Sequence, residues 1–153
     1  MSLHVVLLSP QIPQNTGNIS RLCAATGTHL HLVGTLGFSL SDKYLKRAGL
    51  DYWPHVKLHL HDTLDEALSE APSGGVAYYS SHGTQRYDQF TPPGGEAWLV
   101  FGREADGLPA DVLADHAGDT YKIPIRPVVR SLNLANAVAI VLYDALRQVG
   151  FPS

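Results

Sequence analysis

Hydrophobic positions along the chain fall into short runs separated by stretches of helical periodicity. Apolar runs at residues 3–8, 30–33, 76–80 and 97–101 predict strands buried on both faces. Shorter or alternating patterns at 56–60 and 121–123 predict two more. Helices are expected over 18–25, from Ser41 or Asp42 to Gly49, and over 62–71, 109–114 and 133–149. Such alternation predicts an α/β fold with a mostly parallel sheet and helices on both faces.

The last predicted helix, 133–149, is apolar on more than one side. Its main stripe consists of Leu134, Val138, Val141, Leu142, Ala145 and Val149. Ile140 and Tyr143 lie off this stripe, so one small core leaves part of the apolar surface unused. A second subunit would cover it, and we therefore expect a homodimer.

Length and composition fit an ordinary globular protein. The 153 residues are enough for one domain, which we expect to span 1–153, and 44% of them are hydrophobic. No apolar run is long enough to cross a bilayer, and the first residues do not resemble a signal peptide. Cys23 is the only cysteine, which excludes an internal disulfide and a cysteine metal cluster. These features predict a cytoplasmic protein.

The charge distribution is more informative than the net charge of −3. Residues 1–50 and 120–153 each carry a net charge of +3, whereas residues 51–119 carry −9. If the fold brings the two ends together, they could form one basic face for nucleic-acid phosphates. Chance clustering on a solvated surface explains the same pattern equally well.

Three segments place polar residues and glycines directly after predicted strands. In parallel sheets, ligands bind at the carboxyl ends of the strands, so loops from several strands can meet at one site. The first segment runs from Asn15 to Arg21, with Gly17 expected to make a tight turn and Asn18 to cap the helix. Alone, it is equally typical of a capped helix with a surface arginine.

The second segment is Phe101–Pro109, where Gly102 leaves room for a ligand and Glu104 could hold ribose hydroxyls or a cationic group. Gly107 would allow a left-handed turn there. The third segment is Ile123–Ala137, where Arg130, Ser131 and Asn133 precede an apolar helix. A helix cap explains one of these polar residues but not the set.

Together these motifs resemble those of the SPOUT class of RNA methyltransferases. The residues are N-x-G-N-x-x-R from Asn15, F-G-x-E-x-x-G-L-P from Phe101, and I-P-I followed by R-S-L-N-L-A-N-A from Arg130. The short length and the run Lys46–Trp53 are most similar to the small tRNA (cytidine/uridine) 2′-O-methyltransferases that act at the anticodon wobble position. The resemblance implies S-adenosylmethionine as cofactor, tRNA as substrate, a homodimer and a C-terminal deep trefoil knot.

The resemblance also implies residue roles. The expected cofactor-binding residues are Tyr79, Gly102, Glu104, Gly107, Ile123, Ser131 and Leu132. The expected catalytic residues are Arg21, Ser131 and Asn133, and the expected RNA contacts are Asn15, Arg21, Lys43, Lys46, Arg47 and Arg130. A guanidinium stays protonated in proteins, so we expect Arg21 to orient the target and stabilise developing charge rather than to act as a base. No metal is needed, because the sulfonium already activates the methyl group.

Other functions remain open from the residues alone. The chain could methylate ribosomal RNA or another tRNA position, or it could be a non-catalytic nucleotide-binding or RNA-binding module. A dinucleotide-binding Rossmann enzyme is disfavoured because no G-x-G-x-x-G follows the first strand. Histidines at 29 and 31, and at 59 and 61, have strand-like spacing and lack matching carboxylate motifs, which favours structural roles over metal ligation.

Overall fold

The computed structural model describes residues 2–41 and 53–153, and within them seven strands form one sheet. The strand order is β3-β2-β1-β6-β4-β7-β5, and every neighbouring pair is parallel. The bounds are β1 Leu3–Leu8, β2 His29–Val33, β3 Lys57–His61, β4 Val76–Tyr79, β5 Gln85–Arg86, β6 Ala97–Phe101 and β7 Thr120–Lys122. The predicted α/β class with a parallel sheet is confirmed.

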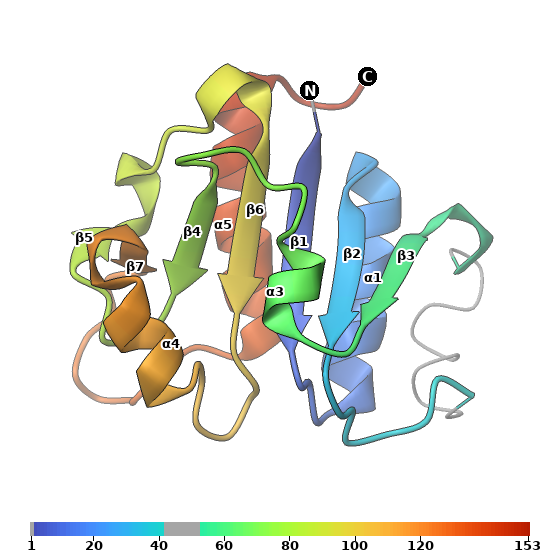
Figure 1. Ribbon diagram of the computed structural model, residues 1–153, viewed down its shortest axis with the longest axis horizontal. Coiled ribbons are helices and arrows are strands. Elements are labelled where there is room, and N and C mark those ends of the chain that lie inside the picture. The colour runs from blue at the N-terminus through green and yellow to red at the C-terminus, as the bar shows by residue number, and fades with distance from the viewer. Residues whose placement is uncertain (1, 42–52) are drawn as a thin grey trace.

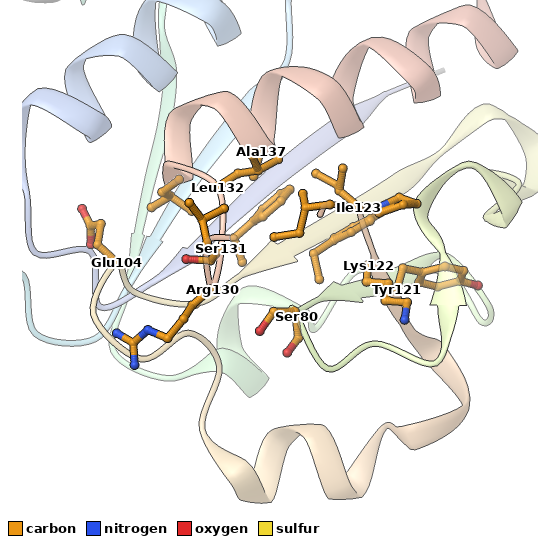
Figure 2. Close-up of a pocket in the computed structure, with 17 residues that line it drawn as sticks. Ser80, Glu104, Tyr121, Lys122, Ile123, Arg130, Ser131, Leu132 and Ala137 are labelled. Carbon is orange, nitrogen blue, oxygen red and sulfur yellow. The ribbon is translucent and has the colours of Figure 1, made fainter. Parts of the chain in front are cut away.

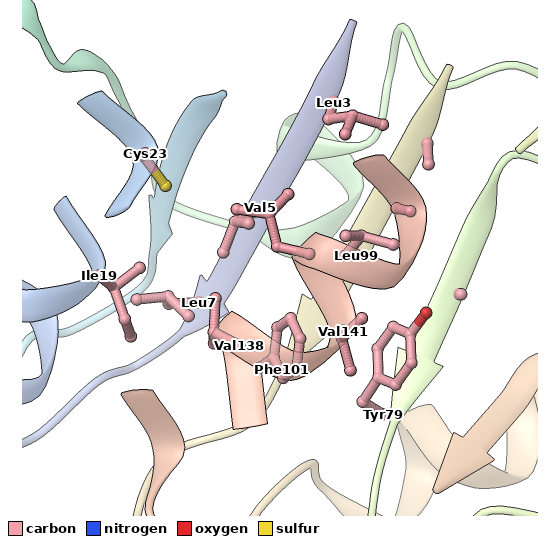
Figure 3. Packing of buried hydrophobic residues seen from close by; sticks show 14 of the residues in the cluster. Leu3, Val5, Leu7, Ile19, Cys23, Tyr79, Leu99, Phe101, Val138 and Val141 are labelled. Atoms are coloured by element: carbon pink, nitrogen blue, oxygen red, sulfur yellow. The ribbon is translucent and has the colours of Figure 1, made fainter. Parts of the chain in front are cut away.

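Helices cover both faces of the sheet, as expected (Figure 1). Helices α1 (Pro13–Thr26) and α5 (Leu134–Val149) lie on one face, and α3 (Leu64–Ala67) and α4 (Ala110–Asp115) lie on the other. The α1 and α5 side holds the larger core, where Val5, Leu99 and Val141 meet (Figure 3). On the opposite face, Val6, Val33 and Val100 form a second core. The central strands β1 and β6 are thus buried on both sides, which explains their continuous apolar runs.

Helix α1 begins at Pro13, five residues before the predicted start at Asn18. Proline suits the first turn because its missing N–H would have no partner there. The prediction of a tight turn at Gly17 was wrong, because Gly17 is buried inside the helix. Asn18 is likewise within the helix and does not cap it. The helix ends as predicted at Gly27, which adopts the left-handed conformation with φ of 68°.

Two other elements differ from the prediction. Thr63 caps α3 by accepting the N–H of Glu66, but the α-helix ends at Ala67 instead of Ala71. Shorter-range turn hydrogen bonds continue to Ala71, just before Pro72. Strand β5 lies at the sheet edge and is only two residues long, and it lacks an apolar run from which it could have been predicted. The helix predicted from Ser41 or Asp42 to Gly49 lies mostly outside the described residues.

Helix α5 matches its prediction closely, and Asn133 caps it by accepting the N–H of Asn136. Its buried residues are Val138, Val141, Leu142, Ala145 and Leu146. Ile140 and Tyr143, the apolar residues off the main stripe, are 38% and 43% exposed. The helix therefore presents a second apolar side away from the core. In the part of the chain that is described, no helix is long and apolar enough to span a membrane.

Candidate active site

A pocket of about 390 Å³ opens at the carboxyl ends of β4, β6 and β7. Its walls combine apolar side chains such as Phe101, Leu132 and Ala137 with polar groups (Figure 2). In this view Glu104 and Arg130 lie to the left, Ser80 lies near the centre and Lys122 lies to the right. An apolar cavity with a few fixed polar groups is the usual form of a site for a small organic ligand.

Six of the seven predicted cofactor-binding residues line this pocket: Tyr79, Gly102, Glu104, Ile123, Ser131 and Leu132. They come from β4, from the loop after β6 and from the segment between β7 and α5, so the fold brings together residues up to 53 positions apart. The Tyr79 ring stacks on Phe101, with ring centroids 5.0 Å apart. Burial raises the pKa of Tyr79 well above its usual range, so its phenol stays neutral.

Gly107 does not line the pocket, but it lies directly against Gly102. A Cβ atom added to Gly102 would stand 2.0 Å from the carbonyl carbon of Gly107 and 2.1 Å from the Leu108 nitrogen. Gly107 has φ of +69°, a conformation that favours glycine, and its N–H donates to the Arg103 carbonyl. The two glycines therefore let the loop after β6 fold back tightly on itself beside the pocket.

The Glu104 carboxylate is hydrogen-bonded to the loop between β1 and α1. One carboxylate oxygen accepts the backbone N–H of Gln11 at 2.8 Å, and the other accepts that of Ile12 at 2.8 Å. In the opposite direction, the side-chain oxygen of Gln11 accepts the backbone N–H of Ala105 at 3.2 Å. Glu104 was expected to hold a ligand's ribose or cationic group. The structure instead engages both of its oxygens with the protein's own backbone.

The same carboxylate begins a chain of hydrogen bonds that joins all three predicted motifs. The Asn15 side-chain Nδ2 donates to Glu104 at 3.2 Å, and the Asn15 side-chain Oδ1 accepts from the Asn133 side-chain Nδ2 at 3.1 Å. Asn133 in turn caps α5. Asn15, predicted as an RNA contact, is only 6% exposed. This chain fixes the loops after β1, β6 and β7 relative to one another.

Glu104→Gln is expected to destabilise the fold by about 1–3 kcal/mol, measured by urea denaturation. Glutamine keeps one acceptor oxygen, but its NH₂ group would face a backbone N–H that currently has a partner. Glu70→Gln is the matched control, since Glu70 is exposed on the far side of the sheet. Equal midpoints for the two variants would show that the Glu104 hydrogen bonds contribute nothing to stability.

Arg21 lines a second hollow of about 620 Å³ between α1 and α5, together with Asn18, Asn133 and Asn136. Because α1 begins at Pro13, and not after Asn18, Arg21 lies in the third turn of the helix. The Asn15–Asn133 pair borders this groove, and its partner Glu104 lines the cofactor-sized pocket. Two of the three predicted catalytic residues, Arg21 and Asn133, therefore share the groove.

The remaining predicted residues divide between the pocket and regions not described. Ser131 and Arg130 are exposed residues that line the pocket rather than the groove. The segment that carries them runs directly into Asn133, so pocket and groove are adjacent along the chain. Lys43, Lys46 and Arg47, predicted to contact RNA, lie outside the described residues.

Sequence reasoning missed several pocket residues, including Ser80, Ser81 and Lys122. Ser80 and Ser81 directly follow the buried strand β4, so the rule that identified the other three loops could have found them. Lys122 ends β7 beside them. The Gln11 side chain was missed as well, and nothing in its local sequence distinguishes it.

The family model described as "SpoU rRNA Methylase family" matches residues 2–143. The chain belongs to this family. The match includes the strands β1, β6 and β7 and the three loops that follow them, which are the segments that build the pocket and the groove.

Individual relatives match over nearly the full length. A Geobacillus stearothermophilus protein, provisionally named tRNA (cytidine(34)-2′-O)-methyltransferase, is 48% identical over 99% of this chain and 98% of its own. A solved structure titled "Structural insights into the 2-OH methylation of C/U34 on tRNA" is 48% identical with a TM-score of 0.87, covering 97% of this chain and 96% of that one. The methyltransferase AviRb from Streptomyces viridochromogenes, solved in complex with AdoMet, is 25% identical with a TM-score of 0.81. That match covers 96% of this chain and 60% of AviRb.

Proposed function

We propose that this chain is an S-adenosylmethionine-dependent methyltransferase that modifies the ribose 2′-hydroxyl of the wobble nucleotide, cytidine or uridine 34, in tRNA. The observation that carries the proposal is the full-length match to a relative named for this reaction, with the three motif segments intact around the pocket and the adjoining groove. Relatives between 43% and 49% identical, each matched over at least 95% of this chain, carry names for the same position.

The pocket fits the cofactor. Its volume of about 390 Å³ lies within the range of small-molecule sites, and its walls offer an apolar surface for an adenine ring. The absence of a side chain at Gly102 lets the backbone of Gly107 and Leu108 pack against this wall of the pocket. Tyr79, Ile123 and Leu132 would supply the apolar contacts, and Ser131 a polar one. When bound, S-adenosylmethionine supplies a methyl group activated by its sulfonium.

The groove would receive the target nucleotide. Arg21 and Asn133 lie there within one hollow, and the segment from Arg130 to Asn133 connects it to the pocket. In this arrangement Arg21 orients the ribose and its phosphate and stabilises the negative charge that develops on the 2′-oxygen. Ser131 and Asn133 hold the ribose, while Arg130 contacts an RNA phosphate. Lys43, Lys46 and Arg47 extend the RNA contacts in our proposal.

The exposed apolar side of α5 supports a homodimer. Ile140 and Tyr143 are exposed on this helix, and the Tyr143 ring lies 6.4 Å from that of Phe151, which is 61% exposed. Burying such a surface against a second copy would remove it from water. The proposal also includes a single methyltransferase domain over 1–153, a C-terminal trefoil knot and a cytoplasmic location.

A methylation assay tests the reaction. With labelled S-adenosylmethionine, we expect label to enter tRNA and not ribosomal RNA, with the 2′-O-methyl mapped to nucleotide 34. A tRNA carrying a deoxyribose at position 34 is the matched control, because it lacks only the acceptor oxygen and should take up no label. Label in ribosomal RNA, or undiminished label in the deoxyribose control, would contradict the assignment of the site of methylation.

A further inference from the structure

Five histidines form a continuous ladder across β1, β2 and β3, on the sheet face that carries α3. They are His4, His29, His31, His59 and His61. Rings on directly paired residues stack. The ring centroid of His4 lies 3.8 Å from that of Trp98 and 4.6 Å from that of His29, and the centroids of His31 and His59 are 4.5 Å apart. Rings on the diagonal form hydrogen bonds instead. None of this belongs to the pocket or the groove.

The ladder contains three hydrogen bonds, each joining Nδ1 of one ring to Nε2 of the next at 2.9 Å. His4 bonds to His31 and His31 to His61, which makes a row of three rings. His29 bonds to His59, which makes a pair. Two of the three bonds therefore tie β2 to the edge strand β3 (Figure 1). The ring nitrogens face one another and, among the described residues, no group of three ligand-type side chains is arranged to hold a metal ion.

The ladder limits how many protons it can take up. A neutral imidazole has one N–H and one lone pair, and each ring-to-ring bond needs one of each. In the row of three, two lone pairs must remain for the two bonds, so only one extra proton fits. In the pair, one lone pair must remain, so again only one extra proton fits. The intact ladder thus accepts at most two extra protons on five rings.

We propose that this ladder is a proton-operated latch on β3, which is closed at neutral pH and releases the edge strand from β2 when acidification adds protons that the hydrogen bonds cannot accommodate. With β3 released, His29, His59 and His61 each have a lone pair that no ring-to-ring hydrogen bond occupies, and the remaining His4–His31 bond leaves room for one proton. The released state therefore holds four protons where the latched state holds at most two. The latch is independent of the proposed methyl transfer.

The surroundings keep the closed ladder neutral. Burial is the main cause that lowers the pKa of His31 to about 3 and that of His4 to about 4, and neighbouring histidines add to it. Burial and charged neighbours also lower the pKa of His29 and His59. Lys57 of β3 acts in the same direction on His4 and His29.

Acidic groups counteract the lowering of the histidine pKa values only near the outer rings of the ladder. Glu96 lies 3.8 Å from His4 Nε2, and Glu70, after α3, partly raises the pKa of His59. The α3 segment packed on β2 and β3 also carries Asp62, Asp65 and Glu66. Because the pKa values of His4, His29, His31 and His59 are lowered in the folded state, the latch is fully closed above the ordinary histidine pKa of about 6.5 and weakens as pH falls below it.

Hydrogen exchange of the backbone amides in β3 tests the latch. Wherever the released state holds two more protons than the latched state, the equilibrium changes about 100-fold per pH unit. We therefore expect the protection factors of residues 57–61 to fall steeply between pH 6.5 and 5, while those of the central strand β6 change far less. Equal loss of protection in β3 and β6 would mean global acid unfolding and would overturn the proposal.

Matched variants separate the ladder from other histidines. The double variant His59→Gln/His61→Gln removes both ladder histidines of β3. The hydrogen-exchange protection of the β3 amides should then depend much less on pH. The control His55→Gln/His82→Gln removes two exposed histidines outside the ladder and should behave like the unmodified protein. A double variant with unaltered pH dependence would overturn the latch. If that variant fails to fold, the comparison of β3 with β6 in the unmodified protein still decides.

Discussion

Arg21→Ala is expected to slow single-turnover methyl transfer to tRNA about 100- to 1000-fold, the typical cost of losing one preorganised donor to developing charge. S-adenosylmethionine affinity should be unchanged, because Arg21 lines the groove between α1 and α5 and not the pocket. The measurement is the rate at saturating cofactor and tRNA, with cofactor affinity determined separately by calorimetry.

Two further variants make this experiment specific. Arg21→Lys should restore only part of the rate, because lysine keeps the charge but loses the planar guanidinium that can donate two parallel hydrogen bonds. Arg147→Ala is the matched control, since this arginine is exposed near the far end of α5 and pairs with Asp144. A rate for Arg21→Ala near that of the unmodified enzyme would remove Arg21 from the reaction and leave Ser131 and Asn133 as candidates.

Gly102→Ala is expected to destabilise the protein by about 3 kcal/mol or more and to abolish measurable cofactor binding. The added methyl would stand 2.0 to 2.4 Å from backbone atoms of Gly107 and Leu108, and backbone cannot swing away as a side chain can. The loop after β6 would have to adopt a different conformation, and this change would disrupt the wall of the pocket that the loop forms. Thermal unfolding and calorimetry with S-adenosylmethionine measure the two effects.

Gly118→Ala provides the control for this variant. Gly118 has no atom within 4 Å of the position of an added Cβ, and its φ is not in the left-handed region, so alanine should fit there. Gly102→Ala with the same unfolding temperature and cofactor affinity as Gly118→Ala would show that the close packing of this loop is not required for the pocket.

Patterns within a few neighbouring residues predicted much of the fold and the site. The run Ala97–Phe101 is a strand because it is apolar throughout, and Asn133 caps α5 because its side chain reaches the N–H of Asn136 three residues ahead. The rule for loops after parallel strands depends only on strand order, and it identified the loops that carry the site. The individual cofactor residues came from the family resemblance, and six of them line one pocket.

Features that depend on distant partners could not be predicted in this way. Helix α1 begins at Pro13 partly because Glu104, 92 residues away from Ile12, accepts an N–H at the start of the helix. The spacing of His29 with His31, and of His59 with His61, indicated one sheet face. Only the register of β2 against β3 shows that stacking and hydrogen bonding alternate between the rings. The tight contact of Gly102 with Gly107 likewise requires the folded loop.

The position of α5 in the chain has a consequence for synthesis on the ribosome. Val138, Val141 and Leu142 complete the larger core, and Leu134 and Ala137 line the pocket, yet all of them are made after every strand of the sheet. Strands β1 and β6 can pair only after residue 101 has emerged, and the part of their shared face that α5 covers is then still open to water. The nascent protein therefore exposes an apolar sheet surface until α5 has emerged, and chaperones would bind it at that stage. Cofactor binding becomes possible only once α5 is in place.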